Sequence, residues 1–193
     1  MTTALPQRVT RVGAQRCPAP APVFTPVPPT GCEPAADMRT LADRLRQALD
    51  LTAGRPLSLP LGGRFFDAVI TADGPEAAAI VRIMDDAQWS PGDSPDACGP
   101  VIHDPARRWL VWLVPPGTSE HWTPHRYGTC LGSPHELALP PLDQTEGPGP
   151  YWLRPCRSDR LIPAGPLWRY LDQFHPGPIP SETILGSMLS TIS

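Results

Sequence analysis

The sequence predicts the α+β class: a single small domain with a mixed β-sheet flanked by helices, and a disordered, proline-rich N-terminus. Three observations lead to this class. Three segments repeat apolar residues with the period of a helix, and five short runs bounded by glycines, prolines or charged turns have the composition of strands. The chain also holds 29 prolines in 193 residues. Proline lacks an N–H and is excluded from helix interiors and central strands, so the folded core must be shorter than the chain.

The prolines divide the chain into three parts. Residues 1–35 include "CPAPAPVFTPVPPTGCEP", a composition that favours extended polyproline II conformations and predicts a disordered tail. Residues 36–175 are expected to form the single folded α+β domain. Residues 176–193 are again punctuated by proline and are expected to be a flexible C-terminal tail.

The helical period marks three segments. The first is "PAADMRTLADRLRQALDLTAG", residues 34–54, in which leucines recur every four positions. The second is "DGPEAAAIVRIMDDAQW", residues 73–89, where Pro75 suits a first helical turn and Glu76 complements the positive end of the helix dipole. The third is "PAGPLWRYLDQF", residues 163–174.

The strand-like runs lie between these helices. "RFFDAVI" (64–70), "HELALP" (135–140) and "PYWLRP" (150–155) each combine apolar or aromatic residues with flanking turn residues, which predicts a short strand. The segment 118–134 shows neither period and is expected to be irregular.

The stretch "PVIHDPARRWLVWLVPPG" predicts a β-hairpin. A strand at Val101–His103 would lead through a turn at "DPAR" into a second strand at Trp109–Val114. The second strand, "WLVWLV", is apolar at every position, which predicts a central strand that is covered on both faces and serves the core rather than catalysis.

Composition narrows the possible functions. The net charge is -3, so the chain lacks the basic balance that is typical of duplex-binding proteins. All 16 basic residues are arginine, which points to a GC-rich genome and means that any basic contact uses the planar guanidinium. The five cysteines are an odd number without a CxxC pair, and no signal peptide or membrane-spanning run is evident. We therefore expect a cytoplasmic protein that makes no membrane contact.

One group of residues resembles a loose zinc-ligand set. His121 and His125 are four residues apart, and Cys98 and Cys130 flank them. A zinc site needs three or four ligands on a rigid frame, whereas a proline interrupts "HWTPH". Solvated histidines and small buried thiols are the simpler interpretation, and no resident metal is expected.

The order of several motifs resembles a known family. "LGGRFFDAVI" is followed by an alanine-rich helix, by "GPV" and "RRWLVWLVPPGT", and then by "PHELALPPLDQTEGPGPYWLRP". This order, over about residues 57–173, is similar to the N-terminal domain of actinobacterial bifunctional DNA primase/polymerase proteins, a branch of the archaeo-eukaryotic primase fold. The strand ending in "VPPG" and the "LALPP" that precedes "GPYWLRP" carry most of the likeness.

The resemblance implies a fold and a chemistry. Such enzymes hold two metal ions with an acid-x-acid pair on one strand and a further acid on another, and a histidine on the hairpin strand helps to hold the nucleotide. Here Asp67 matches the first acid, but Val69 stands where the second belongs, and Trp109 takes the place of the histidine, with His103 on the other hairpin strand. The resemblance therefore implies a catalytically degenerate primase/polymerase-like domain with a binding or regulatory role.

Two other interpretations stay open. The chain could be an active nucleotidyltransferase with a rearranged carboxylate set of Asp67, Asp73 and Asp104, which would require Mg²⁺ or Mn²⁺. It could instead be a protein-interaction module that uses its proline-rich tail. In the degenerate interpretation, weak binding of a nucleotide or of single-stranded nucleic acid would use Arg107 and Arg108 of the hairpin turn as phosphate contacts.

Overall fold

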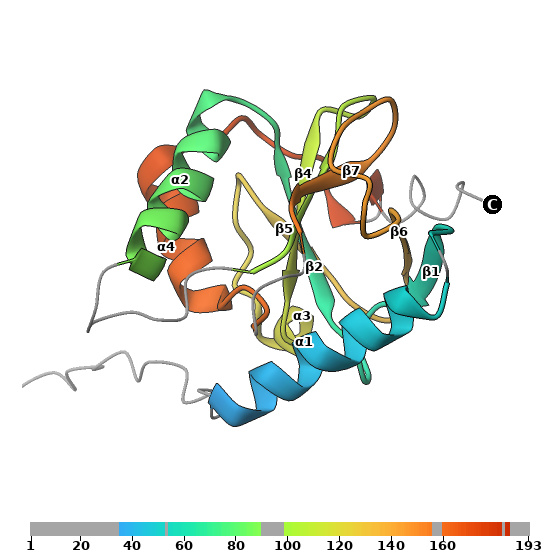
Figure 1. The fold of residues 1–193 in the computed structure, drawn as a ribbon. Helices are drawn as coiled ribbons and strands as arrows, with labels where there is room; N and C mark the ends of the chain where they lie inside the picture. Colours follow the sequence, from blue (N-terminus) through green and yellow to red (C-terminus); the bar gives the residue numbers. More distant parts are fainter. Residues whose placement is uncertain (1–34, 53, 90–98, 156–159, 183, 186–193) are drawn as a thin grey trace, which may run out of the picture. The chain divides into compact units, whose positions relative to one another are not determined.

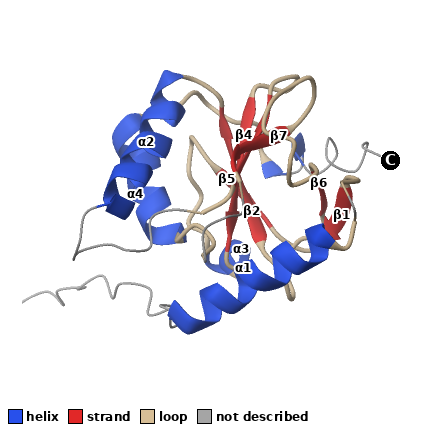
Figure 2. Cartoon of the chain, in the orientation of Figure 1, coloured by secondary structure: helices blue, strands red, loops and turns tan. Residues whose placement is uncertain are grey.

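The computed structural model describes residues 35–52, 54–89, 99–155, 160–182 and 184–185, all within the compact unit Glu33–Ser193. This unit combines helices with antiparallel sheets, which confirms the α+β class (Figures 1 and 2). The proline-rich segment that was expected to be disordered lies outside the described residues.

The described chain forms four helices and seven strands. The helices are α1 (Ala35–Asp50), α2 (Pro75–Trp89), α3 (Thr118–His121) and α4 (Ala164–Phe174). The strands are β1 (Leu57–Pro60), β2 (Asp67–Ala72), β3 (Val101–Asp104), β4 (Trp109–Val114), β5 (Thr129–Leu131), β6 (Glu136–Leu139) and β7 (Tyr151–Arg154).

The three predicted helices and five predicted strands are present, and three further elements are not predicted by the sequence. These are β1, α3 and β5, each no longer than four residues. Their residues show no period long enough to identify them, so their conformation depends on the neighbours they pair with or pack against. The segment 118–134 is consequently not irregular throughout, because it contains α3 and β5.

The strands form two sheets. Five strands are ordered β5-β2-β4-β3-β7, and β1 pairs with β6 in a separate two-stranded sheet. Every pair among the described strands is antiparallel, whereas a mixed sheet was expected. The short connections of the predicted hairpin allow antiparallel neighbours without a crossover helix.

Strand β4 lies at the centre of the larger sheet and separates two hydrophobic cores. Its odd-numbered residues, Trp109, Val111 and Leu113, face the core formed with α1, β1 and β6. Its even-numbered residues face the core beneath α2 and α4, which lie together on the other side of the sheet (Figure 1). All six residues of β4 are buried, which confirms the prediction of a central, two-faced strand.

The helices cover the sheet through single apolar stripes. Buried leucines at four-residue spacing in α1 meet one core, and Leu167 and Leu171 of α4 meet the other together with Ile80 and Met84 of α2. Polar residues take the opposite faces, as expected for helices that pack on one side only. Among the described residues, no helix combines the length and the apolar character that crossing a membrane requires.

The C-terminal segment differs from the flexible tail that the sequence predicts. In its described part, Leu185 is 0% exposed and belongs to the core on the α1 side. The Thr129 hydroxyl donates a hydrogen bond of 3.3 Å to the carbonyl of Pro180. The domain therefore extends beyond residue 175, because Pro180 contacts strand β5 and Leu185 is buried in the core.

A register shift in β7 allows Arg154 to form an ion pair with helix α2. Val101 pairs with Arg154 while Ile102 pairs with Trp152, so Leu153 is an extra residue in β7. Such a bulge moves the residues that follow it to the opposite face of the strand. Arg154 thereby reaches the α2 side, where its guanidinium lies 2.6 Å from the carboxylate of Asp85.

The hydrogen bond between Trp112 and Thr71 at the centre of the sheet can be tested by mutation. The indole N–H of Trp112 donates to the hydroxyl of Thr71 at 2.9 Å, and both side chains are 0% exposed. Thr71→Val should lower the free energy of unfolding by about 1–3 kcal/mol, because it leaves the buried indole N–H without an acceptor. Trp112→Phe should cost about 2 kcal/mol, mainly through lost packing.

Urea denaturation of the two single variants and the double variant measures the coupling between these residues. The double variant should be less destabilised than the sum of the single ones by about 1 kcal/mol, because residues in contact are not additive. Losses that add to within about 0.3 kcal/mol would show that this hydrogen bond contributes nothing to stability.

Candidate functional site

The predicted catalytic residue Asp67 is the first residue of β2 and is 0% exposed. Its Oδ2 atom accepts a hydrogen bond of 2.7 Å from the backbone N–H of Ser119. Its Oδ1 atom is buried and has no hydrogen-bond partner within the described part of the chain. The carboxylate is thus held on one side by α3, and one of its oxygen atoms is unsatisfied.

The "VPPGT" segment explains how α3 reaches Asp67. Strand β4 ends at Val114, and the two prolines that follow cannot extend the ladder because they lack N–H groups. Gly117 has a φ of 83° and turns the chain into α3. The single helical turn then places the Ser119 N–H on the Asp67 carboxylate, so the motif serves to cover this end of β2.

Two glycines make room for the Asp67 carboxylate. A Cβ atom at Gly132 would lie 2.9 Å from Cβ of Ser119 and 3.3 Å from Oδ1 of Asp67. A Cβ atom at Gly62, whose φ is +76°, would lie 3.6 Å from the same oxygen. The carboxylate is therefore enclosed by backbone and small residues, and at Gly132 a larger side chain would collide with α3.

The three acids of the rearranged set lie at two ends of the sheet. Asp67 pairs with Val114, whereas Asp104 pairs with Trp109, which in turn pairs with Ala72. Asp104 is thus five strand positions from Asp67, or about 17 Å at about 3.4 Å per residue. Asp73 follows Ala72 and lies at the Asp104 end. Within the described ranges, no group of three or more His, Cys, Asp or Glu residues could hold a metal ion.

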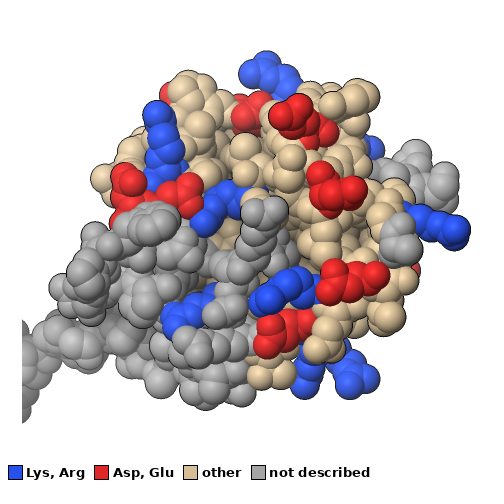
Figure 3. Space-filling model, viewed as in Figure 1, with Lys and Arg blue, Asp and Glu red and all other residues tan. Residues whose placement is uncertain are grey.

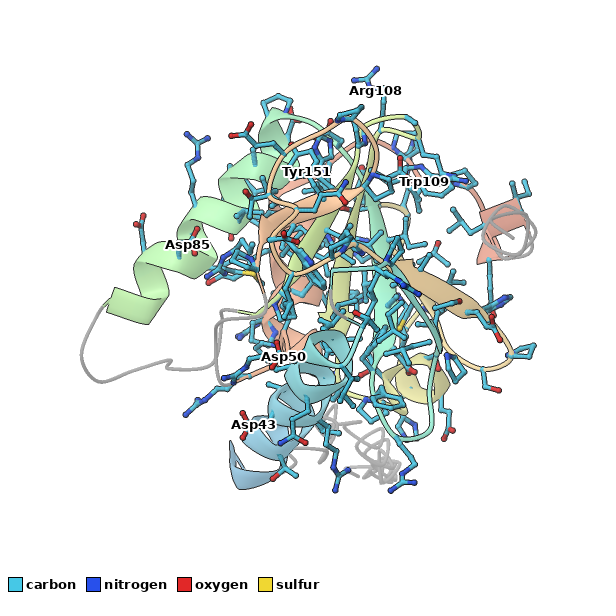
Figure 4. All side chains as sticks on the ribbon, turned by 45° about the vertical axis from the view of Figure 1, so that its right-hand side comes forward. Asp43, Asp50, Asp85, Arg108, Trp109 and Tyr151 are labelled. Atoms are coloured by element: carbon cyan, nitrogen blue, oxygen red, sulfur yellow. The ribbon has the colours of Figure 1, made fainter. Side chains whose placement is uncertain are left out.

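The hairpin arginines differ from each other. The Arg107 guanidinium lies 2.7 Å from Asp104 and 5.9 Å from the ring centroid of Trp109, so it is held within the turn. Arg108 is exposed and has a positive φ of 58°. Its side chain has no hydrogen bond or ion pair to any described residue, and Figure 4 shows it projecting from the end of the molecule where Tyr151 also lies. Arg108 is thus the one of the two that is available to a phosphate.

A chain of hydrogen bonds joins three segments at the same end of the sheet. The Tyr151 hydroxyl lies 2.7 Å from Nδ1 of His103, and Nε2 of His103 lies 3.1 Å from Oδ2 of Asp73. The two rings meet edge to face with their centroids 5.1 Å apart. His103 and Asp73 have side chains that are 17% and 34% exposed, so the group is accessible from solvent.

Sequence reasoning does not identify this group, because its members lie 30 and 48 residues apart. The predicted hairpin is the only sequence feature that points to this group. It places His103 near the end of β3 that lies beside the turn between β2 and α2. The pairing of β3 with β7 sets Tyr151 directly opposite His103, and this register is not visible in the sequence.

This chain matches no described protein family, no curated protein and no solved structure. The resemblance to primase/polymerase domains accordingly stays a prediction from sequence motifs.

The residues of the loose zinc set are not gathered at one point. His121 ends the short helix α3 and is exposed, whereas Cys130 is a buried residue of β5. Burial raises the pKa of the Cys130 thiol far above its ordinary value, and the charges of Asp67 and Glu182 raise it further. A thiol with so high a pKa is a poor nucleophile and a poor metal ligand. Cys98 lies outside the described residues.

His125 belongs to an aromatic cluster between the 122–128 loop and α4. Its ring lies 4.9 Å from that of Trp168 and 5.6 Å from that of Tyr127, between centroids. Its Nδ1 atom accepts a hydrogen bond of 3.2 Å from the backbone N–H of Tyr127. Burial lowers the pKa of His125, with Asp172 opposing and His175 reinforcing this shift. The cluster therefore favours a neutral imidazole.

The face of the molecule shown in Figure 3 has no dominant sign of charge. On the face in Figure 3, arginine and acidic side chains are interspersed among uncharged ones. A surface of this kind gives little long-range attraction to a polyanion, so any binding of nucleic acid depends on local contacts.

The position of Asp67 predicts how its variants behave. Asp67→Ala should lower the free energy of unfolding by about 1–3 kcal/mol, because the partly buried N–H of Ser119 loses its acceptor. Asp67→Asn should lose clearly less, because the amide oxygen can accept the same bond and no buried charge remains. Thermal and urea denaturation measure both variants. Equal losses would show that the Ser119 bond does not stabilise the fold.

The lowered pKa of His125 predicts a pH dependence of stability. The unfolded state binds a proton near the ordinary histidine value of about 6.5, and the folded state binds it only at lower pH. The contribution of His125 is therefore complete above about pH 6.5 and is lost as the pH falls below that value.

The variant His125→Asn isolates this contribution, because asparagine accepts the same local N–H and does not titrate. Free energies of unfolding at several values between pH 5 and pH 8 should fall less steeply toward acid in the variant than in the wild type. Parallel curves would contradict the assignment.

Proposed function

We propose that this chain is a divergent DNA primase/polymerase-like domain without a working two-metal site, and that it acts as a binding module for nucleotides or single-stranded nucleic acid. The order of its sequence motifs supplies the class. The antiparallel sheet between helices, with Asp67 on β2 and the "VPPG" segment directly after β4, is compatible with it. The odd number of cysteines and the buried free thiol of Cys130 favour work in the reducing cytoplasm.

The separation of the carboxylates carries this proposal. Two-metal phosphoryl transfer needs carboxylates that converge on ions about 3.5–4 Å apart. Asp67 is enclosed at one end of β2, while Asp73 and Asp104 lie at the other end and are engaged by His103 and Arg107. Each of these carboxylates would have to break its present hydrogen bond or ion pair before it could bind a metal ion. This arrangement supports the degenerate interpretation over the active nucleotidyltransferase.

The free guanidinium of Arg108 supports a binding role. Arginine recognises phosphate through two parallel hydrogen bonds, and this side chain is exposed and unattached to the described residues. Its backbone is fixed, because the Arg108 carbonyl accepts a hydrogen bond of 2.8 Å from the N–H of Asp73. A phosphate held there would lie at the end of the sheet opposite to Asp67.

Primer extension tests the absence of polymerase activity. Purified wild-type protein should give no template-dependent extension above background with either Mg²⁺ or Mn²⁺. The matched variant is Asp67→Asn, which removes the charge and keeps the acceptor for Ser119. Extension by the wild type that disappears in this variant would restore the enzyme and end the degenerate interpretation.

Fluorescence anisotropy with a labelled single-stranded oligonucleotide tests the binding role. Arg108→Asn removes the charge and keeps a residue that tolerates positive φ. It should weaken binding roughly tenfold and reduce the salt dependence by about one phosphate contact, a slope of about 0.7 for single strands. Arg82→Gln, on the exposed side of α2, is the control and should bind like the wild type. Equal weakening by both variants would show nonspecific attraction and would contradict a site at Arg108.

A further inference from the structure

We propose that Tyr151, His103 and Asp73 form a metal-independent acid–base site that acts on phosphate esters, with Tyr151 as the nucleophile. This inference goes beyond the binding role proposed above and does not depend on the resemblance to primases. It rests on the hydrogen-bonded chain of these three residues and on the free arginine at the same end of the sheet.

The geometry of the three residues is that of an activated nucleophile. Such a nucleophile lies within about 2.6–3.2 Å of a base, and a third group orients the base. The Tyr151 hydroxyl lies 2.7 Å from Nδ1 of His103, and Asp73 lies 3.1 Å from Nε2. If Nε2 carries the proton and donates it to the Asp73 carboxylate, Nδ1 is left free to accept from the phenol. The carboxylate also stabilises the imidazolium that forms when His103 takes up a proton.

Three separate segments hold this geometry. Register pairing places Tyr151 of β7 directly opposite His103 of β3. The N–H of Asp73 donates to the carbonyl of Arg108, which fixes the β2–α2 turn against the hairpin. The side chains of His103 and Asp73 stay partly exposed, so a solvent-borne ester can reach the site.

One arginine at this end of the sheet is available to an anionic substrate, because its charge is not taken up by a described carboxylate. Arg107 is held by Asp104, but the Arg108 guanidinium is unattached to the described residues and extends from the same end of the molecule as Tyr151 (Figure 4). Arginine binds the non-bridging oxygens of a phosphate and stabilises the charge that develops on them during transfer. A phosphodiester therefore fits this site better than a neutral ester does.

The chemical step conserves atoms and charge without a further reactant besides solvent water. The Tyr151 oxygen attacks phosphorus, and a bond forms between these two atoms while the bond from phosphorus to the leaving oxygen breaks. The phenolic proton passes to Nδ1 of His103, and the leaving oxygen, on the far side of phosphorus in an in-line displacement, departs with the bonding electron pair and takes up a proton from solvent water. The products are a phosphorylated Tyr151 and a free alcohol or phenol.

The probe for this step is bis(4-nitrophenyl) phosphate, used with the full-length chain in the presence of EDTA. We expect a burst of nitrophenol that approaches one equivalent per chain, together with an intact-mass increase of one aryl phosphate group that peptide mapping places on Tyr151. Tyr151→Phe should abolish the burst and the label. Tyr127→Phe is the matched control, because Tyr127 also lies beside histidine rings but its hydroxyl has no hydrogen bond to a described residue; it should label like the wild type.

Further variants separate catalysis from folding. His103→Ala should slow the burst roughly 10²-fold, the usual contribution of general acid–base catalysis, and added imidazole should restore part of the rate. Asp73→Asn, at the positioning residue, should slow the burst without raising the half-saturating probe concentration, whereas Arg108→Asn should mainly raise that concentration. Wild-type protein that gives neither burst nor label, or that labels equally in Tyr151→Phe, would overturn the proposal. Failure of oligonucleotide binding alone would leave it intact, because the two assays do not share a readout.

Discussion

The burial of strand β4 on both faces is the constraint on which the rest of the domain depends. A strand with six apolar residues cannot face water on either side, so the sheet needs a layer on each face. Helices α2 and α4 supply one layer, and α1 with the β1–β6 pair supplies the other. Polar chemistry is thereby driven out of the sheet centre, and the only described side-chain hydrogen bond between its buried residues joins Trp112 to Thr71.

Because the centre of the sheet is apolar, its polar groups gather at the two ends of β2, and these ends differ. At the Asp67 end, α3 and two glycines enclose a carboxylate that keeps one unsatisfied oxygen, an arrangement that costs about 1–3 kcal/mol. At the Asp73 end, the hydrogen-bonded chain with His103 and Tyr151 is open to solvent, and the Arg108 side chain projects from the same end of the domain (Figure 4). The fold therefore has one closed polar end and one open polar end, and the open end is the one suited to ligand binding.

The sequence predicts the elements that carry their own pattern and misses those that depend on partners. The apolar run of β4 and the helical stripes of α1, α2 and α4 are long enough to identify the class and the central strand. By contrast, β5 forms because its residues pair with β2, and α3 forms because Asp67 accepts the N–H of Ser119. The same limit applies to the site. Asp67 can be placed on a strand from the sequence, but the contact between His103 and Tyr151 depends on the register of β3 and β7, for which the sequence has no local signal.

The extra residue in β7 allows this short strand to contact both His103 of β3 and Asp85 of α2. Side chains along a strand alternate between the two faces of the sheet. The extra residue Leu153 shifts this alternation by one position, so the residue after it faces the opposite way from what the residues up to Trp152 would predict. The phase before the shift aims Tyr151 at His103, and the phase after it aims Arg154 at Asp85 on the helix above the same face. Leu153 acts as a spacer between these two phases and is itself turned outward. In a strand of uniform phase Arg154 would lie on the face opposite to Tyr151, so the extra residue is what lets Tyr151 and Arg154 share one face of the sheet.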